Sequence, residues 1–284
     1  MQEPSHSQWS GKTDGTPWMQ NALIGMYRYM PLRLLYGVMA LVIPFYMIFN
    51  RSGYKAMYSF FRKRMGYGPF KSFFSVYGNH YNFGMVILDR FAVYAGKKFD
   101  VTVEGQELFD NLESAEKGFI MLSSHVGCYE LAGYSLVSKH KTFNAIVYAG
   151  ESQAIMKNRD RILREHNMRM IPVMGDMSHL FAINAALDHN EILSMPADRL
   201  FGSSKSVTCK FFGEDAKFPK GAYALAKAKD VKMLAVFVMK EKAKKYHAYV
   251  REVADANGFA TELEQIVRKY PKQWYNYFDF WNQG

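Results

Sequence analysis

The sequence has little cysteine: Cys128 and Cys209 are the only two in 284 residues. Two cysteines cannot build a disulfide framework, and no Cys and His residues have the spacing of a metal site. This composition indicates a reducing compartment. Residues 1–14 lack a basic stretch followed by an apolar core, so we expect no cleaved secretory signal. The chain also lacks internal repeats and low-complexity segments.

Acidic residues are in deficit, with 26 Asp and Glu against 36 Lys and Arg, which gives a formal net charge of +10. A positive field favours anionic partners such as phospholipid surfaces, nucleic acid or acidic carrier proteins. Zinc-finger spacing and the glycine-rich aromatic box of RNA-binding sheets are both missing, so we expect no nucleic acid. Hydrophobic residues make up 49% and charged residues 22%, which is typical of a folded protein.

One apolar run stands near the N-terminus, where residues 34–49 contain no charge. The run is about sixteen residues long, shorter than the ~20 needed to cross a bilayer. Pro44 is expected to break or kink a helix there. Arg33 and Arg51 flank the run and could face anionic head groups. A re-entrant, tilted or interfacial helix is predicted, and a buried core helix is the alternative.

The distribution of apolar and polar residues along the chain predicts three parts: a polar tail over 1–16, a helical membrane-associated region over 17–95, and an α/β domain over 96–284. In the third part, short apolar runs alternate with amphipathic stretches, the pattern of a sheet covered by helices. Strands are expected near 101–103, 118–122, 145–148, 191–195, 207–212, 233–238 and 247–250, and helices near 128–138, 151–166, 177–189, 221–229 and 260–269.

Candidate catalytic residues follow the apolar run 119–122. Two serines and His125 come directly after it, and Glu130 lies five positions after His125. Catalytic groups gather at the carboxyl ends of strands in α/β sheets. If His125 lies in the turn before a helix and Glu130 in its first turn, the two can meet. A positioned imidazole can then deprotonate an attacking alcohol while a carboxylate fixes its tautomer. The alternative is a helix-capping histidine and a glutamate on an exposed face.

This His-x4-Glu spacing resembles the motif of the lysophospholipid acyltransferase superfamily, and most closely its lipid A late (lauroyl and myristoyl) acyltransferase branch. Four further blocks resemble that branch in the same order: 195–202, 208–213, 218–226 and 270–275. The likeness covers about residues 118–281, and the N-terminal apolar run is similar to the membrane anchor of the family.

The resemblance implies a glycerol-3-phosphate acyltransferase-like fold, a mixed α/β sheet flanked by helices, with an N-terminal apolar anchor. It implies that His125 is the general base and Glu130 orients it. Asp198, Arg199, Lys220 and Arg164 are expected to bind polar groups of the substrates. The lipid acceptor would offer a hydroxyl or amine, and the donor would be acyl-carrier protein or acyl-CoA. The expected location is the cytoplasmic face of the bacterial inner membrane, with no metal and no cofactor.

Departures from the branch leave the acceptor open between a lipid A precursor and another bacterial lipid. Leu200 replaces the second acid of the middle block, and Pro219-Lys220 replaces a threonine before the glycine. A thioesterase or lipid hydrolase using the same pair, and an inactive lipid-binding scaffold, are the alternatives. A cysteine hydrolase is not expected, because Cys128 falls in a predicted helix and no Gly-x-Ser-x-Gly or Gly-x-Cys-x-Gly elbow is present.

Overall fold

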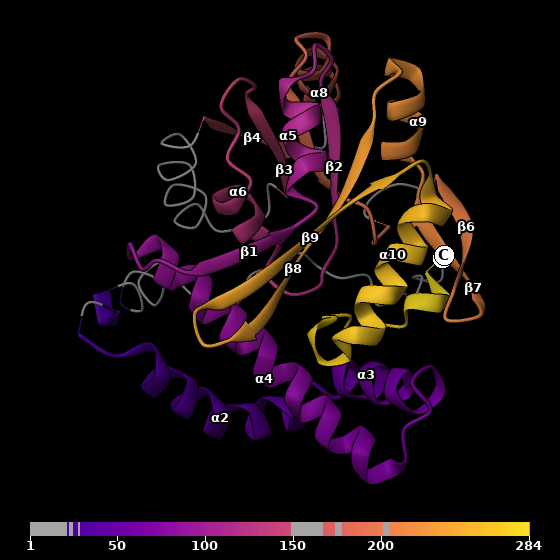
Figure 1. The fold of residues 1–284 in the computed structure, drawn as a ribbon. Helices are drawn as coiled ribbons and strands as arrows, with labels where there is room; N and C mark the ends of the chain where they lie inside the picture. Colours follow the sequence, from indigo (N-terminus) through magenta and orange to yellow (C-terminus); the bar gives the residue numbers. More distant parts are fainter. Residues whose placement is uncertain are drawn as a thin grey trace.

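The computed structural model describes residues 22, 25–27, 29–148, 167–173, 178–200 and 205–283. Its centre is a seven-stranded sheet with the strand order β1-β9-β8-β2-β5-β3-β4 (Figure 1). All neighbours in this sheet are parallel except β8 and β9, so the predicted mixed α/β sheet is confirmed. The strands are β1 (Asp100–Glu104), β2 (Phe119–Ser123), β3 (Phe143–Tyr148), β4 (Met168–Val173), β5 (Ile192–Pro196), β8 (Met233–Lys242) and β9 (Lys245–Val253). A separate antiparallel pair consists of β6 (Ser206–Phe211) and β7 (Glu214–Pro219).

Helices cover both faces of the large sheet. Alternate residues of β8 enter two different cores: Ala235 and Phe237 pack on one face, and Val236 and Val238 on the other. This period of two is the expected signature of a strand buried on both sides. The first face is covered by α8 (Ser178–Asp188), α9 (Gly221–Lys229) and α10 (Ala256–Lys269), and the second by α5 (Gln106–Ser114), η1 (Tyr129–Leu131) and α6 (Ala132–Ser135).

Three N-terminal helices, α2 (Leu32–Phe49), α3 (Arg51–Lys63) and α4 (Pro69–Tyr94), lie together along one side of the sheet (Figure 1). The prediction was that Pro44 breaks or kinks the helix; α2 continues through Pro44, so this proline does not break it. Its 18 residues have a mean hydropathy of 1.9, and only 22% of them are buried. By length and composition α2 could cross a membrane, but such a helix can also belong to a soluble core.

A buried ion pair fastens this helical layer to the sheet. Lys240 of β8 contacts the carboxylate of Asp89 in α4, and their side chains are 5% and 0% exposed. The hydroxyls of Tyr36 and Tyr246 also donate to Asp89, and Lys240 Nζ lies 3.0 Å from Tyr36 Oη. Buried charges are stable only when they are paired and hydrogen-bonded, which this cluster achieves. The network therefore fixes the position of α4 along β8.

Some local elements differ from the sequence-based expectations. The strands β4 and β7 and the helix α5 were not predicted. The helix expected over 128–138 is reduced to η1 and the four-residue α6. The helix expected over 151–166 lies outside the described residues.

Candidate active site

The register of two parallel strands brings His125 and Asp198 together. Ser123, the last residue of β2, is paired with Pro196, the last residue of β5. His125 follows its strand by two residues, and so does Asp198. The carboxyl ends of adjacent parallel strands lie at the same sheet edge, where ligands and catalytic groups collect in α/β folds.

Asp198 accepts two hydrogen bonds from His125. Its Oδ1 lies 2.9 Å from His125 Nδ1, and its Oδ2 lies 2.8 Å from the backbone nitrogen of the same residue. Asp198 is fully buried, whereas the His125 side chain is 22% exposed. A carboxylate at Nδ1 favours the tautomer with its proton on Nδ1, and this leaves a lone pair on Nε2.

The charges of this pair suit proton abstraction near neutral pH. Burial lowers the pKa of His125 below its usual value, and the nearby Arg199 acts in the same direction against the opposing effect of Asp198. Burial opposes ionisation of Asp198, but its interactions with His125 and the charge of Arg199 outweigh burial and lower the pKa of this carboxyl. We therefore expect a neutral imidazole beside an ionised carboxylate, the resting state that a general base needs.

The C-terminal segment holds the loop that carries His125. The backbone N–H of Tyr275 donates to the carbonyl of His125 at 2.9 Å, and Val126 forms an isolated bridge with the buried Trp274. Gly127 has φ +52°, and a Cβ there would lie 2.0 Å from the backbone oxygen of Val238. Only glycine tolerates both conditions. The loop is thus clamped between β8 and residues of the block 270–275.

The carboxylate of Glu130 is bonded to α4. It accepts hydrogen bonds from Arg90 and Tyr94, each at 3.1 Å. In the described part of the chain, the acid that accepts from His125 Nδ1 is Asp198. Glu130 lies in the first turn of η1, the position that contact with His125 would require. Its bonds to Arg90 and Tyr94 tie η1 to α4 and so support the loop from the other side.

The other residues expected to bind substrate are Arg199, Lys220 and Arg164. Arg199 donates to the backbone carbonyl of Tyr275, and its guanidinium lies 5.4 Å from the centre of the Phe278 ring. Lys220 is exposed at the start of α9, and no described contact links its side chain to His125 or Asp198. Arg164 lies outside the described residues. Arg199 is therefore the one of these three basic residues that the described structure places beside the His125–Asp198 pair.

Cysteine nucleophily and metal binding are the other chemistries to consider at this site. Burial strongly raises the pKa of the Cys128 thiol, with a further contribution from Glu130, so this cysteine stays protonated and is a poor nucleophile. Among the described residues, no group of three or more His, Cys, Asp or Glu is arranged to hold a metal ion.

The link between His125 and Asp198 could not be predicted from sequence, which suggested Asp198 for substrate binding. The one sequence pattern that the two residues share is their position: each lies two residues after the end of an apolar strand. No sequence pattern pointed to Arg90 and Tyr94 as partners of Glu130, because they lie at the end of a long helix.

Comparison with known proteins places the chain among lipid enzymes. Residues 79–281 match the family model described as bacterial lipid A biosynthesis acyltransferase. The crystal structure of the 1-acyl-sn-glycerophosphate (LPA) acyltransferase PlsC from Thermotoga maritima matches with 15% identity and a TM-score of 0.39, over 90% of this chain and 96% of that one. No curated protein sequence matches the chain.

Proposed function

The chain belongs to the bacterial lipid A biosynthesis acyltransferase family, and we propose that it moves a fatty acyl chain from a thioester donor onto a hydroxyl or amine of a membrane lipid. Family membership makes the protein an acyltransferase that acts on lipid substrates. The donor, the acceptor and the location are the parts proposed here. The observation that carries the mechanism is the 2.9 Å contact between His125 Nδ1 and Asp198.

In the proposed reaction His125 Nε2 removes the proton of the acceptor as its oxygen or nitrogen attacks the thioester carbonyl. The carbon–sulfur bond then breaks, and the imidazolium returns the proton to the leaving thiolate. Asp198 keeps Nδ1 protonated and stabilises the imidazolium while it exists. This route needs no covalent enzyme intermediate, which agrees with a protonated Cys128. General-base catalysis of this kind contributes roughly 10²–10⁴-fold.

The substrates are proposed from the family description and from charge. The donor is acyl-carrier protein or acyl-CoA, and the net charge of +10 suits an acidic or phosphorylated donor. The acceptor is a lipid A precursor or another bacterial lipid. Arg199, Lys220 and Arg164 remain proposed ligands of polar substrate groups, and Glu130 is proposed as a positioning residue.

We propose that the enzyme works at the cytoplasmic face of the inner membrane. The support is α2, whose large apolar side chains include Leu41 at 74% and Phe49 at 83% exposure. An amphipathic or apolar helix exposed in this way can lie in the membrane interface. A lipid acceptor would then reach the sheet edge from the bilayer.

The test is acyl transfer by purified protein supplied with acyl-carrier protein or acyl-CoA and lipid acceptors in mixed micelles. His125→Ala should lower transfer by at least about 10²-fold, because it removes the base. His189→Ala is the matched control, since His189 is exposed after α8 and away from the site. Equal activity of His125→Ala and wild type would contradict the mechanism, and free fatty acid as the sole product would identify a hydrolase.

A further inference from the structure

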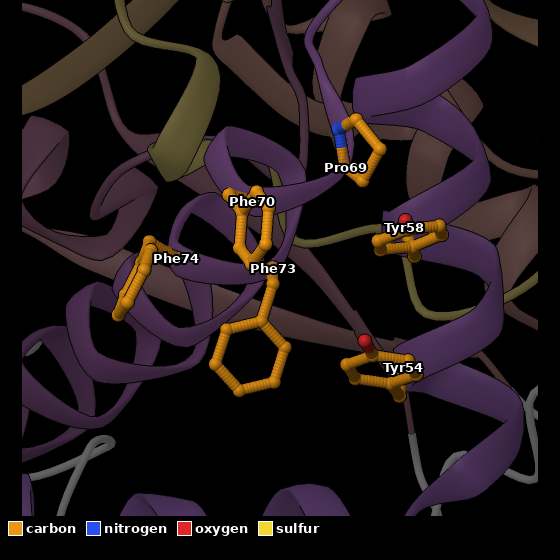
Figure 2. Close-up of a pocket in the computed structure, with 6 residues that line it drawn as sticks. All are labelled: Tyr54, Tyr58, Pro69, Phe70, Phe73 and Phe74. Atoms are coloured by element: carbon orange, nitrogen blue, oxygen red, sulfur yellow. The ribbon is translucent and has the colours of Figure 1, made fainter.

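An apolar groove lies between α2, α3 and α4, outside the His125 site. Tyr54 and Tyr58 of α3 lie opposite Phe70 and Phe73 of α4 across an open gap, and Phe74 lies beyond them (Figure 2). This end of the groove has a volume of about 420 Å³. None of the side chains that line it carries a charge.

The groove continues toward α2. A second stretch of about 620 Å³ shares Tyr54, Phe73 and Phe74 with the first and adds Pro44 and Ile48, among others. Together the two stretches run along α4 from Pro69 to Tyr77. At 1.5 Å per helical residue this path is about 12 Å long. Its length and apolar lining suit a hydrocarbon chain.

The three phenylalanines of the groove are unusually open to solvent, whereas its tyrosines are partly buried. Phe70 is 83% exposed, Phe74 63% and Phe73 47%. Single exposed apolar residues are ordinary, but a contiguous apolar patch on a soluble surface marks a binding site. The neighbouring face of α2 extends the patch with Phe45 at 65% and Ile48 at 61% exposure.

Charge identifies the kind of ligand. Arg51 lines the α2 end of the groove and is the only charged residue among the lining residues of both stretches. It is exposed, and it forms no hydrogen bond or ion pair with another described residue. Residues 32–94 contain eight Lys and Arg and one acid, the buried Asp89, so this layer supplies seven of the ten net positive charges of the chain. An apolar groove lined by one cation, within a layer of net positive charge, is complementary to an anionic amphiphile.

We propose that this groove binds one hydrocarbon chain of an anionic lipid from the membrane, with the lipid head group paired to Arg51. The site is separate from the acyl-transfer centre, and its function is to hold the helical layer on the anionic leaflet. It does not depend on the catalytic assignment.

The proposal is tested by calorimetric titration of the full-length protein with dodecyl phosphate kept below its critical micelle concentration. Saturable binding at one site is expected, whereas inorganic phosphate and dodecanol should bind far more weakly. Arg51→Gln should weaken binding about tenfold, equivalent to ~1.4 kcal/mol. The matched charge control is Lys227→Gln, because Lys227 is exposed on α9.

A second pair of variants tests whether the apolar groove binds the hydrocarbon chain. Phe73→Ser should weaken binding of dodecyl phosphate, whereas Phe181→Ser should not, although Phe181 of α8 is 81% exposed. Circular dichroism should show that all four variants are folded. Co-flotation with vesicles of phosphatidylglycerol and phosphatidylcholine in equal parts should fall for Arg51→Gln and Phe73→Ser and stay unchanged for the controls.

Three results would overturn the proposal. Binding of inorganic phosphate as strong as that of dodecyl phosphate would show a simple anion site. Equal binding by Arg51→Gln and Lys227→Gln would remove the head-group contact. A dimer in sedimentation analysis that Phe73→Ser dissolves would show that a second copy of the chain covers the groove. Because His125→Ala should retain dodecyl phosphate binding, a failed transfer assay and a failed binding assay remain distinguishable.

Discussion

Replacing Asp198 by Asn is the most direct test of how His125 is activated. The change keeps the size of a fully buried side chain but removes its charge and one of its two acceptors. In the native site both oxygens accept, one from the His125 backbone N–H at 2.8 Å and one from Nδ1–H at 2.9 Å. The backbone N–H of His125 can only donate, so the single oxygen of the new amide must remain its acceptor.

The amide nitrogen of the substituted side chain then faces His125 Nδ1 and can only donate to it. Nδ1 must become the acceptor, and the ring proton moves to Nε2, where the lone pair for the acceptor substrate is needed. An equivalent change of tautomer in a Ser-His-Asp triad lowers kcat about 10⁴-fold. Here the loss should lie between about 10² and 10⁴, the full contribution of general-base catalysis.

The assay compares kcat/KM for acyl transfer by Asp198→Asn and Glu130→Gln. Glu130 bonds Arg90 and Tyr94, so its substitution disturbs the support of η1 and should cost less than that of Asp198. Unfolding by urea, followed by circular dichroism, should show both variants folded. A larger loss for Glu130→Gln than for Asp198→Asn would refute the reasoning and return the orienting role to Glu130.

Two further predictions concern the same loop. Because burial lowers the pKa of His125, kcat/KM should stay level as pH falls to about 6.5 and decline only at lower pH, where the imidazole gains a proton. The folded state disfavours that proton, so the contribution of His125 to stability is present above its unfolded pKa and decreases as pH falls below about 6.5. An acid limb of kcat/KM centred above this pH would contradict the burial argument. Gly127→Ala should lower the free energy of unfolding by at least about 1–3 kcal/mol, since a Cβ at φ +52° would meet the Val238 carbonyl oxygen at 2.0 Å. Urea denaturation measures this change, and wild-type stability would show that the loop relaxes without strain.

The sequence alone predicted the features that depend on local patterns. Short apolar runs located β2, β5 and β8, because a buried strand needs consecutive apolar residues. The α/β class followed from their alternation with amphipathic stretches, and the family followed from five ordered motifs. Strands with mixed polarity were missed: β7 alternates between exposed and buried positions and is rich in charged residues, so its composition is that of a polar loop.

Pairing between distant segments was decided only by the tertiary structure. The distance between His125 and Asp198 depends on β2 and β5 being neighbours in register, and a strand does not carry the identity of its neighbour in its own residues. Only four residues separate His125 from Glu130, so sequence proximity favoured that pair. The fold instead turns Glu130 toward Arg90 and Tyr94, whose position on α4 depends on the buried contact of Asp89 with Lys240.

The apolar surface also has a part that the sequence predicted and a part that only the fold produced. Composition identified residues 34–49 as a candidate membrane segment, because hydropathy is a property of consecutive residues. The groove forms because the packing of α3 against α4 places Tyr54 and Tyr58 opposite Phe70 and Phe73. Helix packing depends on side chains that lie far apart in the chain. Local sequence thus determined which segments are apolar and which carry reactive groups, whereas the long-range contacts of the folded chain decided which of these face one another.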